Sequence, residues 1–252
     1  MILIHPHELG LFCYHGHMVT KQRGLAMELR KRIASGEFSV TNKLPTEDRL
    51  MERYGVSRYC VRGAIAELTA AGEVFPVCGS GVFVRERRDG NYLPLGTSYG
   101  ISADFPGRRV TSEVRELALV RADARLALRM RCDEGDRVWR VVRLRRVDGL
   151  PISYETACYL KEFVPYIGED VAGGSLYSYV HDDLGLRFGF VDKTVYLDRL
   201  DASAAGSLGL REGDPSICVE DDAFLSNGRL FNSSRSLYHS ANARFYSAAP
   251  MR

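Results

Sequence analysis

The chain of 252 residues is 45% hydrophobic and 26% charged, which is ordinary for a folded globular protein and long enough for two domains. No apolar run approaches the ~20 residues needed to span a bilayer, and the opening segment lacks the basic start of a signal peptide. Its six cysteines form no C-x-x-C pair, so we expect idle or buried thiols, no cofactor and a cytoplasmic protein.

The net charge of +2 is unevenly distributed along the chain. Residues 18–90 hold thirteen Lys and Arg against nine Asp and Glu, an excess of +4, whereas residues 91–252 hold 21 against 22. A basic first third points to a polyanion as its partner.

The histidines gather at the start of the chain. Four of the six precede residue 18, and together with a cysteine they are His5, His7, Cys13, His15 and His17. Two H-x-H pairs and a thiol are able to bind Zn or Cu, so a metal-responsive protein is one hypothesis. The hypothesis that we favour treats residues 1–17 as an N-terminal extension, a candidate for disorder, without a metal site.

A first helix is predicted over residues 22–33, where Leu25, Leu29 and Ile33 recur at a four-residue period. Pro45 and Thr46 open a second one, with Thr46 as its N-cap and acidic residues in its first turn, where they face the positive end of the helix dipole.

Gly55 ends the second helix and Ser57 caps a third, in which Val61, Ile65 and Leu68 are the expected core positions. Arg58 and Arg62 lie four residues apart and therefore share another face of that helix. Two short helices joined by a tight glycine turn form a helix-turn-helix.

A hairpin is predicted after Gly72, where "EVFPVCGSGVFV" places two short apolar runs around Gly79, Ser80 and Gly81. Three helices followed by a hairpin make a winged helix-turn-helix, which we assign to residues 18–86. Residues 87–97 then follow as a polar linker, and residues 98–248 as a second domain.

The second domain contains a degenerate internal repeat. Each copy has a short helix, Glu-Gly-Asp (134–136 and 212–214), a strand, an Asp-Gly or Asn-Gly turn (148–149 and 227–228) and a second strand. This pattern predicts pseudo-twofold halves in one mostly antiparallel sheet with a cleft where they meet. Chance similarity between two hairpins is the alternative. The fold class of the whole chain is α+β.

The segment "LPTEDRLMERYGVSRYCVRGAIAELTAAGEVFPVCGSGVFV" resembles the DNA-binding domain of the GntR family of bacterial transcription regulators. The shared frame is Leu-Pro-x-Glu, Gly-Val-Ser-Arg, Val-Arg-x-Ala and a Gly-x-Gly-x-Phe-Val wing. The rest of the chain resembles the effector-binding UTRA domain of the HutC branch, which has a chorismate lyase-like fold. "RVVRLRRVDGLPISYE", "GSLYSYV" and "FNSSRSLYH" carry that second resemblance.

The first resemblance implies that the third helix lies in the major groove of DNA, where arginine can pair with guanine O6 and N7. The positions implied to contact DNA are Thr46, Arg49, Ser57, Arg58, Tyr59, Cys60, Arg62, Gly79, Ser80 and Gly81. Three features depart from the family pattern: Asp48 stands where many relatives have Arg, Cys60 replaces a small hydroxyl residue, and the wing has no cation between its glycines. Fewer cations predict a shallower dependence of DNA binding on salt.

The second resemblance implies a pocket for a small anionic metabolite, such as a sugar phosphate. Arg143 and Arg145 alternate along a strand and would converge on the anion. Ser175 and Tyr177 are implied to be hydroxyl donors at a helix N-terminus, and Glu155 to accept from ligand hydroxyls. Tyr238 is implied to line the pocket. Asn232, an implied effector-binding residue, stands where sugar-phosphate sensors often have Glu.

The hypothesis for the whole chain is a homodimeric, ligand-responsive regulator, most simply a repressor. Its implied partners are a palindromic double-stranded operator and the metabolite, with no membrane, and the bound form is associated with the nucleoid. Dimerisation is expected through the C-terminal sheet. The alternative class is a chorismate lyase-like enzyme, in which Glu155 would be the acid or base.

Overall fold

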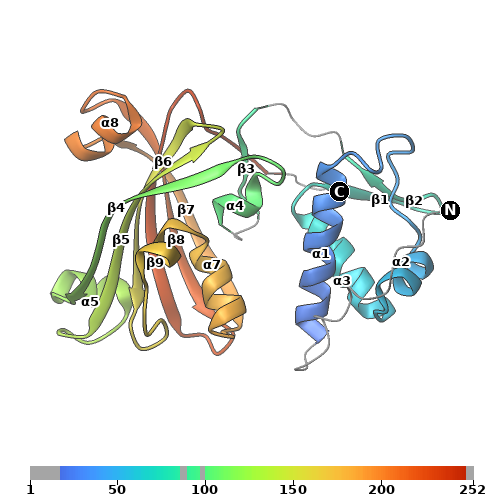
Figure 1. The fold of residues 1–252 in the computed structure, drawn as a ribbon, viewed down its shortest axis with the longest axis horizontal. Coiled ribbons are helices and arrows are strands. Elements are labelled where there is room, and N and C mark those ends of the chain that lie inside the picture. Colours follow the sequence, from blue (N-terminus) through green and yellow to red (C-terminus); the bar gives the residue numbers. More distant parts are fainter. Residues whose placement is uncertain (1–17, 86–89, 97–99, 248–252) are drawn as a thin grey trace. The chain divides into compact units, whose positions relative to one another are not determined.

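A computed structural model describes residues 18–85, 90–96 and 100–247. The histidine-rich segment 1–17 lies outside the described residues. The chain divides into two compact units, one holding the described residues up to 85 and the other those from 90 to 247 (Figure 1).

Three helices and a hairpin form the first unit. They are α1 (Met18–Ala34), α2 (Glu47–Tyr54), α3 (Arg58–Ala70), β1 (Val74–Val77) and β2 (Gly81–Val84). The core lies between the helices, where Leu25, Leu29, Leu50, Val61 and Leu68 are buried. The predicted winged helix-turn-helix is therefore present, and the periodic apolar positions of each helix supply its core.

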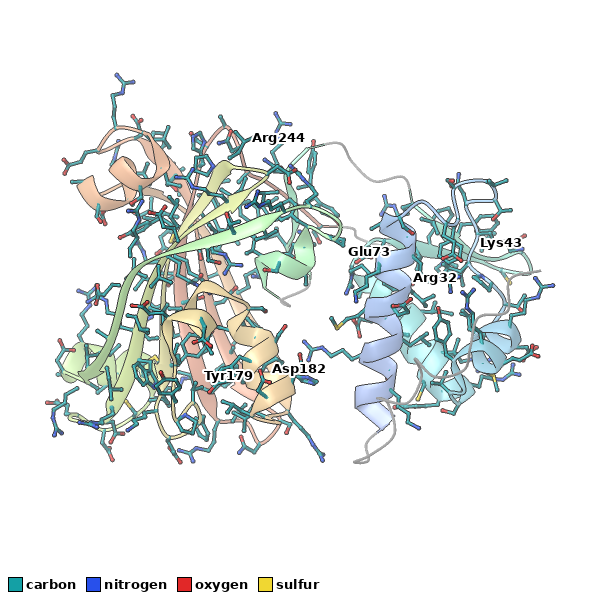
Figure 2. All side chains as sticks on the ribbon, viewed as in Figure 1. Arg32, Lys43, Glu73, Tyr179, Asp182 and Arg244 are labelled. Carbon is teal, nitrogen blue, oxygen red and sulfur yellow. The ribbon has the colours of Figure 1, made fainter. Side chains whose placement is uncertain are left out.

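The predicted turn chemistry is visible at the ends of α2 and α3. The Thr46 side chain accepts a hydrogen bond from the Arg49 amide, and Ser57 does the same for the Cys60 amide, so both are N-caps. Gly55 ends α2 with φ of 59°, a left-handed conformation that glycine adopts without a Cβ penalty. Arg32 links α1 to α2, because its side chain is bound to the Tyr54 hydroxyl of α2 as well as to Glu37 (Figure 2).

One six-stranded antiparallel sheet dominates the second unit, in the order β4-β5-β6-β9-β8-β7. Its strands are β4 (Val110–Arg121), β5 (Arg137–Val147), β6 (Leu150–Leu160), β7 (Phe188–Arg199), β8 (Pro215–Leu225) and β9 (Leu230–Tyr238). The short elements are α4 (Ile101–Asp104), α5 (Ala124–Met130), α6 (Glu169–Gly173), α7 (Leu176–Ser178), the π-helical turn Tyr179–Asp183 and α8 (Ala202–Leu208). The predicted α+β class with a mostly antiparallel sheet is confirmed.

The internal repeat is present in the backbone hydrogen bonds. In the first copy the amide of Ala122 donates to Asp136 O and that of Gly135 to Ala122 O; in the second, Leu200 donates to Asp214 O and Gly213 to Leu200 O. Aspartates cap the equivalent helices α5 and α8. Since β6 of the first half pairs with β9 of the second, the halves meet at the centre of the sheet.

The structure differs from the sequence prediction in the segment expected to be a linker. Tyr92–Pro94 form β3, which pairs in parallel with β10 (Arg244–Tyr246) near the other end of the chain. Leu93 is buried beside Phe105, Val147 and Ile152. Local sequence patterns do not reveal a pairing partner 152 residues away, as Arg244 is from Tyr92. An isolated three-residue strand also has no periodicity to detect.

Candidate DNA-binding surface and effector pocket

The third helix presents its two arginines at the surface, where acidic residues of α2 bind them. Arg62 Nε donates to both carboxylate oxygens of Glu47, at 3.1 and 3.0 Å. Arg58 Nη2 lies 2.5 Å from Asp48 Oδ1, and its Nη1 lies 3.5 Å from Glu47 Oε2. The side chains of Arg58 and Arg62 are 50% and 65% exposed, so both remain accessible to a ligand in solution.

The other residues implied to contact DNA divide into an exposed group and one exception. Thr46, Arg49, Ser57, Tyr59, Gly79, Ser80 and Gly81 are exposed. Cys60 differs, because it is 1% exposed and its sulfur lies 3.4 Å from the Ser57 hydroxyl. The Cys60 side chain therefore points into the core between the helices, not to the surface that holds Arg58 and Arg62. We no longer expect it to contact DNA.

The wing has a neighbouring cation that the sequence analysis missed. Lys43 forms an isolated bridge with Phe83 of β2, and its ammonium lies 5.6 Å from the centroid of the Phe83 ring (Figure 2). A Cβ added at Gly81 would lie 2.6 Å from Lys43 Cε, so glycine allows this close approach. No local pattern signals this contact, since Lys43 precedes α2 in the chain and reaches the wing only through the tertiary fold.

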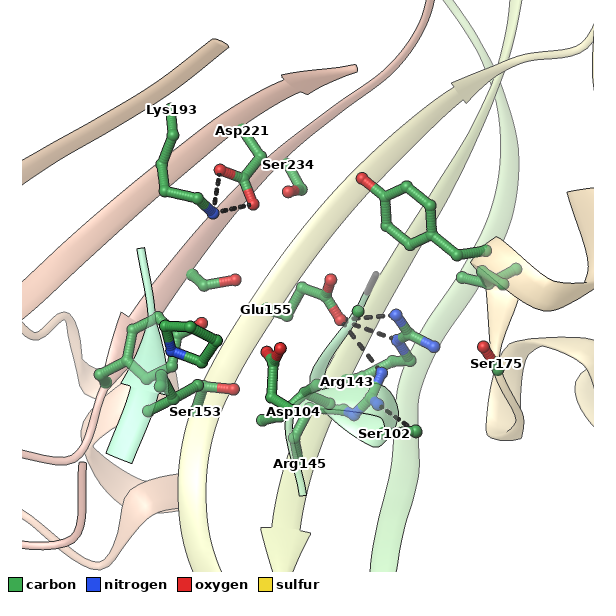
Figure 3. Close-up of a pocket in the computed structure, with 18 of the residues that line it drawn as sticks. Ser102, Asp104, Arg143, Arg145, Ser153, Glu155, Ser175, Lys193, Asp221 and Ser234 are labelled. Atoms are coloured by element: carbon green, nitrogen blue, oxygen red, sulfur yellow. Dashed lines mark hydrogen bonds and ion pairs between the residues drawn. The ribbon is translucent and has the colours of Figure 1, made fainter. Parts of the chain in front are cut away.

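A polar pocket lies on one face of the six-stranded sheet (Figure 3). The strands contribute its floor, α4 and the α6–α7 segment contribute walls, and β3 and β10 close one side. Its polar lining consists of Ser102, Asp104, Arg143, Arg145, Ser153, Glu155, Ser175, Tyr177, Lys193, Asp221, Ser234, Ser236 and Tyr238.

Strand register arranges the floor of the pocket in transverse rows. One row runs Arg143, Glu155 and Ser236 across β5, β6 and β9. The row on one side runs Arg145, Ser153 and Tyr238, and that on the other runs Lys193, Asp221 and Ser234 across β7, β8 and β9. Because side chains alternate between the faces of a strand, all of these point to the same side.

The two pocket arginines are used differently. Arg143 donates through Nε and Nη2 to Glu155 Oε2, at 3.0 and 2.6 Å, and through Nη1 to the carbonyls of Ala172 and Gly174. Arg145 donates through Nη2 to Ser102 Oγ at 3.2 Å, while its buried Nε has no hydrogen-bond partner among the described residues. Arg145 is 5% exposed, so this donor is shielded from water, and Nη1 of the same side chain lies 3.7 Å from Glu155 Oε2.

Burial and neighbouring charges together set the ionisation of Glu155 and Arg145. Burial opposes ionisation of Glu155, but Arg143 and Arg145 outweigh it and hold the pKa of that carboxyl below its ordinary value. Burial, with the like charge of Arg143, lowers the pKa of Arg145 to about 10, so the guanidinium stays charged at neutral pH. Two cations therefore face the one carboxylate of Glu155. Over the whole lining the charges balance, because Arg143, Arg145 and Lys193 are matched by Glu155, Asp221 and Asp104.

A second ion pair, Lys193 with Asp221, was missed by the sequence analysis. Lys193 Nζ lies 2.7 and 2.9 Å from the two carboxylate oxygens of Asp221, and both side chains are 19% exposed. The repeat offered a signal for Asp221, because it lies seven residues after Asp214 just as Arg143 lies seven after Asp136. The two copies thus place side chains of opposite charge at equivalent positions.

The remaining predicted effector residues have mixed placements. Tyr177 and Tyr238 line the pocket, and burial raises the pKa of both phenols, which keeps them as hydroxyl donors. Ser175 also lines it, but its Oγ caps α7, a single turn of three residues and therefore no helix-dipole anion site. Asn232 does not line the pocket. It is 1% exposed, and its Oδ1 accepts a hydrogen bond from the Tyr177 hydroxyl at 3.3 Å.

Two negative observations limit other chemistry in the part of the chain that the structure describes. It contains no group of three or more His, Cys, Asp or Glu placed to hold a metal ion. None of its helices is long and apolar enough to cross a membrane.

A polar pocket on an antiparallel sheet, joined in one chain to a winged helix-turn-helix, defines a ligand-sensing DNA-binding protein. Two family models match the chain: the UTRA domain over residues 106–244, more than half of its length, and the bacterial regulatory proteins of the gntR family over residues 21–84. The chain therefore belongs to the gntR family, in its branch with a UTRA domain.

Several relatives align over almost the whole chain. The HTH-type regulator YydK of Bacillus subtilis strain 168 is 29% identical, covering 89% of this chain and 95% of its own. Its crystal structure superposes with a TM-score of 0.71 at 27% identity, over 91% of this chain and 99% of that one. The transcriptional regulator TreR of the same organism is 25% identical over 86% of this chain and 92% of its own.

These findings make the protein a transcriptional regulator with a helix-turn-helix DNA-binding domain and a UTRA effector-binding domain.

Proposed function

We propose that this regulator is a cytoplasmic, homodimeric repressor whose operator affinity is controlled by a small anionic metabolite bound in the sheet pocket, and that it is not an enzyme. One observation carries the choice of an anion: Arg145 lines the pocket, and its buried Nε has no hydrogen-bond partner among the described residues. An unsatisfied buried donor costs about 1–3 kcal/mol, which a carboxylate or phosphate oxygen would recover if the Arg145 side chain turns this donor toward the pocket on binding.

The two arginines of the pocket have different contacts and therefore different proposed roles. Arg143 is largely committed to Glu155 and to two backbone carbonyls, so its role is to hold Glu155 and to add positive charge. Arg145 is the anion-binding residue, with Ser102 and Ser153 beside it as hydroxyl donors. The Lys193–Asp221 pair offers a donor and an acceptor to the rest of the ligand.

The same geometry argues against the lyase alternative. A catalytic acid near neutral pH needs a raised pKa, whereas the pKa of Glu155 is lowered by two arginines. Glu155 is suited to accept hydrogen bonds from ligand hydroxyls. Two relatives with the same architecture support the repressor assignment, since NagR of Bacillus subtilis and MngR of Escherichia coli are named as repressors.

A binding experiment tests the anion site. Thermal-shift screening of phosphorylated and carboxylated metabolites, with inorganic phosphate as the reference anion, is expected to raise the melting temperature of the wild type by mass action. Arg145→Gln should abolish the shift. Arg146→Gln is the matched control, because Arg146 is the next residue of β5 and its Nη1 donates to the Gly149 carbonyl outside the pocket. Equal shifts in both variants would contradict the proposal.

On the DNA side, α3 enters the major groove with Arg58, Arg62 and Tyr59 directed at the bases or phosphates. Thr46, Arg49, Ser57 and the wing residues Gly79, Ser80 and Gly81 are proposed to contact the backbone. A homodimer places two such helices on successive turns of a palindromic operator, about 34–36 Å apart. Arg62→Ala should weaken operator binding by about 1–3 kcal/mol and relax specificity at one base pair. Fluorescence anisotropy that records unchanged affinity would remove α3 from the groove.

A further inference from the structure

The two arginines of α3 do not project freely into solvent. Each is bound by a carboxylate from the first turn of α2, and three contacts between 2.5 and 3.1 Å hold them. The side chains of Asp48 and Glu47 are 76% and 31% exposed, so the acids share the surface that the arginines present.

This arrangement opposes binding to phosphates in general. Sequence-independent DNA binding comes from cations that neutralise phosphates and release counterions. A phosphate approaching Arg58 must displace Asp48 and is itself repelled by that carboxylate. An exposed ion pair is worth at most about 1 kcal/mol, or a factor of about five in an equilibrium constant.

The arrangement leaves base contacts open. Glu47 accepts from Nε of Arg62 and does not use its two terminal nitrogens. A guanidinium has five N–H donors, and two parallel donors on one edge suffice to pair with guanine O6 and N7. Arg62 can therefore keep Glu47 while its terminal edge meets a base, and Glu47 restricts the directions in which that edge points.

We propose that Glu47 and Asp48 are specificity-determining residues of the DNA-binding surface, which suppress binding to arbitrary duplex while Arg62 remains available to a guanine. The inference rests on the proposed placement of α3 in the major groove. Asp48 forms an ion pair with Arg58 that opposes the binding of phosphates to this arginine. Glu47 is a positioning residue for Arg62.

The test compares Asp48→Asn with Glu52→Gln in the full-length protein. Both changes remove one negative charge from an exposed side chain of α2, but of these two acids it is Asp48 that contacts Arg58 in the described residues. Fluorescence anisotropy is recorded against a random-sequence duplex and against a duplex selected from a random library with the wild type, each over a range of salt concentrations.

Asp48→Asn is expected to bind the random duplex about two- to fivefold more tightly than Glu52→Gln. The slope of log K against log salt should steepen by about 0.9 for each protomer bound, because each then neutralises one more phosphate. The ratio of selected-duplex to random-duplex affinity should fall. Asp48→Glu, which keeps the charge, should restore the wild-type ratio.

Indistinguishable random-duplex affinities and slopes for Asp48→Asn and Glu52→Gln would overturn the inference, since the effect would then be one of net charge alone. Arg62→Ala, measured in parallel, distinguishes failure of the proposed role of Asp48 from failure of the proposed placement of α3 in the groove. If it weakens binding to the selected duplex while the two charge variants agree, only the role of Asp48 fails. If it changes nothing, the groove placement fails.

Discussion

At the scale of single residues, the pocket cluster joins ligand binding to the folding of its own domain. Glu155 lies between Arg143 and Arg145, and the three side chains form one buried network in which each depends on the others. Breaking a buried pair by removing one partner is strongly destabilising, because the remaining charge is left in a low-dielectric site. The residues that would bind an anion are therefore also part of what holds β5 and β6 in place.

Glu155 gives the protein a predictable response to acid. Its folded-state pKa lies below the ordinary value of 4.5, so the unfolded chain binds the proton more readily. The stabilisation is complete above pH ~4.5 and is lost as the pH falls through the lower folded-state pKa. Glu155→Gln should cost about 3 kcal/mol at neutral pH and should flatten the loss of stability below pH ~4.5. Urea unfolding across this range checks both, and an unchanged acid slope would contradict the linkage.

Lys43 gives a second prediction at this scale. If its ammonium beside the wing contacts a phosphate, Lys43→Ala should reduce the slope of log K against log salt by about 0.9 for each protomer bound. Lys21→Ala removes an exposed cation from α1 of the same unit and serves as the control. Equal slopes for the two variants in anisotropy titrations would show that Lys43 merely covers Phe83.

At the scale of elements, the duplicated helix–turn–strand unit explains the architecture of the sheet. Aspartate N-caps start α5 and α8, and the Glu-Gly-Asp turns return the chain to β5 and β8 through the same hydrogen bonds. Arg121 and Arg199 each donate to the carbonyl of the turn glycine in their own copy. Equivalent local sequences have thus built equivalent local structures in both halves.

Two glycines of the second copy should respond to alanine in opposite directions. Gly213 in the Glu-Gly-Asp turn has φ of 81°, where an L side chain is strained, so Gly213→Ala should destabilise the domain by about 1 kcal/mol. Gly206 lies inside α8 with open space around its Cα, so Gly206→Ala should stabilise the domain by about 0.5–1 kcal/mol. Denaturant midpoints measure both, and a shift in the same direction would refute this account of the turn.

At the scale of the whole molecule, function requires that the two units communicate. In the proposed mechanism, effector binding and DNA binding are coupled by a free energy that is the same in both directions, typically 1–3 kcal/mol. Arg145→Gln keeps the Arg143–Glu155 ion pair, so the variant should fold and bind operator like the wild type in the absence of effector. The metabolite that shifts the wild-type titration should leave that of the variant unchanged.

Reciprocity supplies the independent check of this coupling. Saturating operator DNA should change the affinity of the wild type for the metabolite by the same factor that the metabolite changes its affinity for DNA. Isothermal titration of metabolite into free and DNA-bound protein measures it. Equal metabolite affinities in the free and the DNA-bound protein would contradict the coupling.

Local chemistry by itself determined the first unit and the plan of the second. Apolar periodicity, the Thr46 and Ser57 caps and the Gly55 turn are short-range signals, so helix boundaries followed from neighbouring residues. The repeat and its Gly-containing turns indicated a pair of strands in each copy, which the structure shows as 137–147 with 150–160 and 215–225 with 230–238.

Only the tertiary structure decided which side chains meet across long separations. It placed Cys60 in the core, Lys43 beside the wing, β3 against β10, and Asn232 behind Tyr177 rather than in the pocket. It also bound Arg58 and Arg62 to acids ten and fifteen residues earlier in the chain. Such contacts depend on register and packing between elements, which local propensities do not encode, whereas caps, turns and periodicity are properties of adjacent residues.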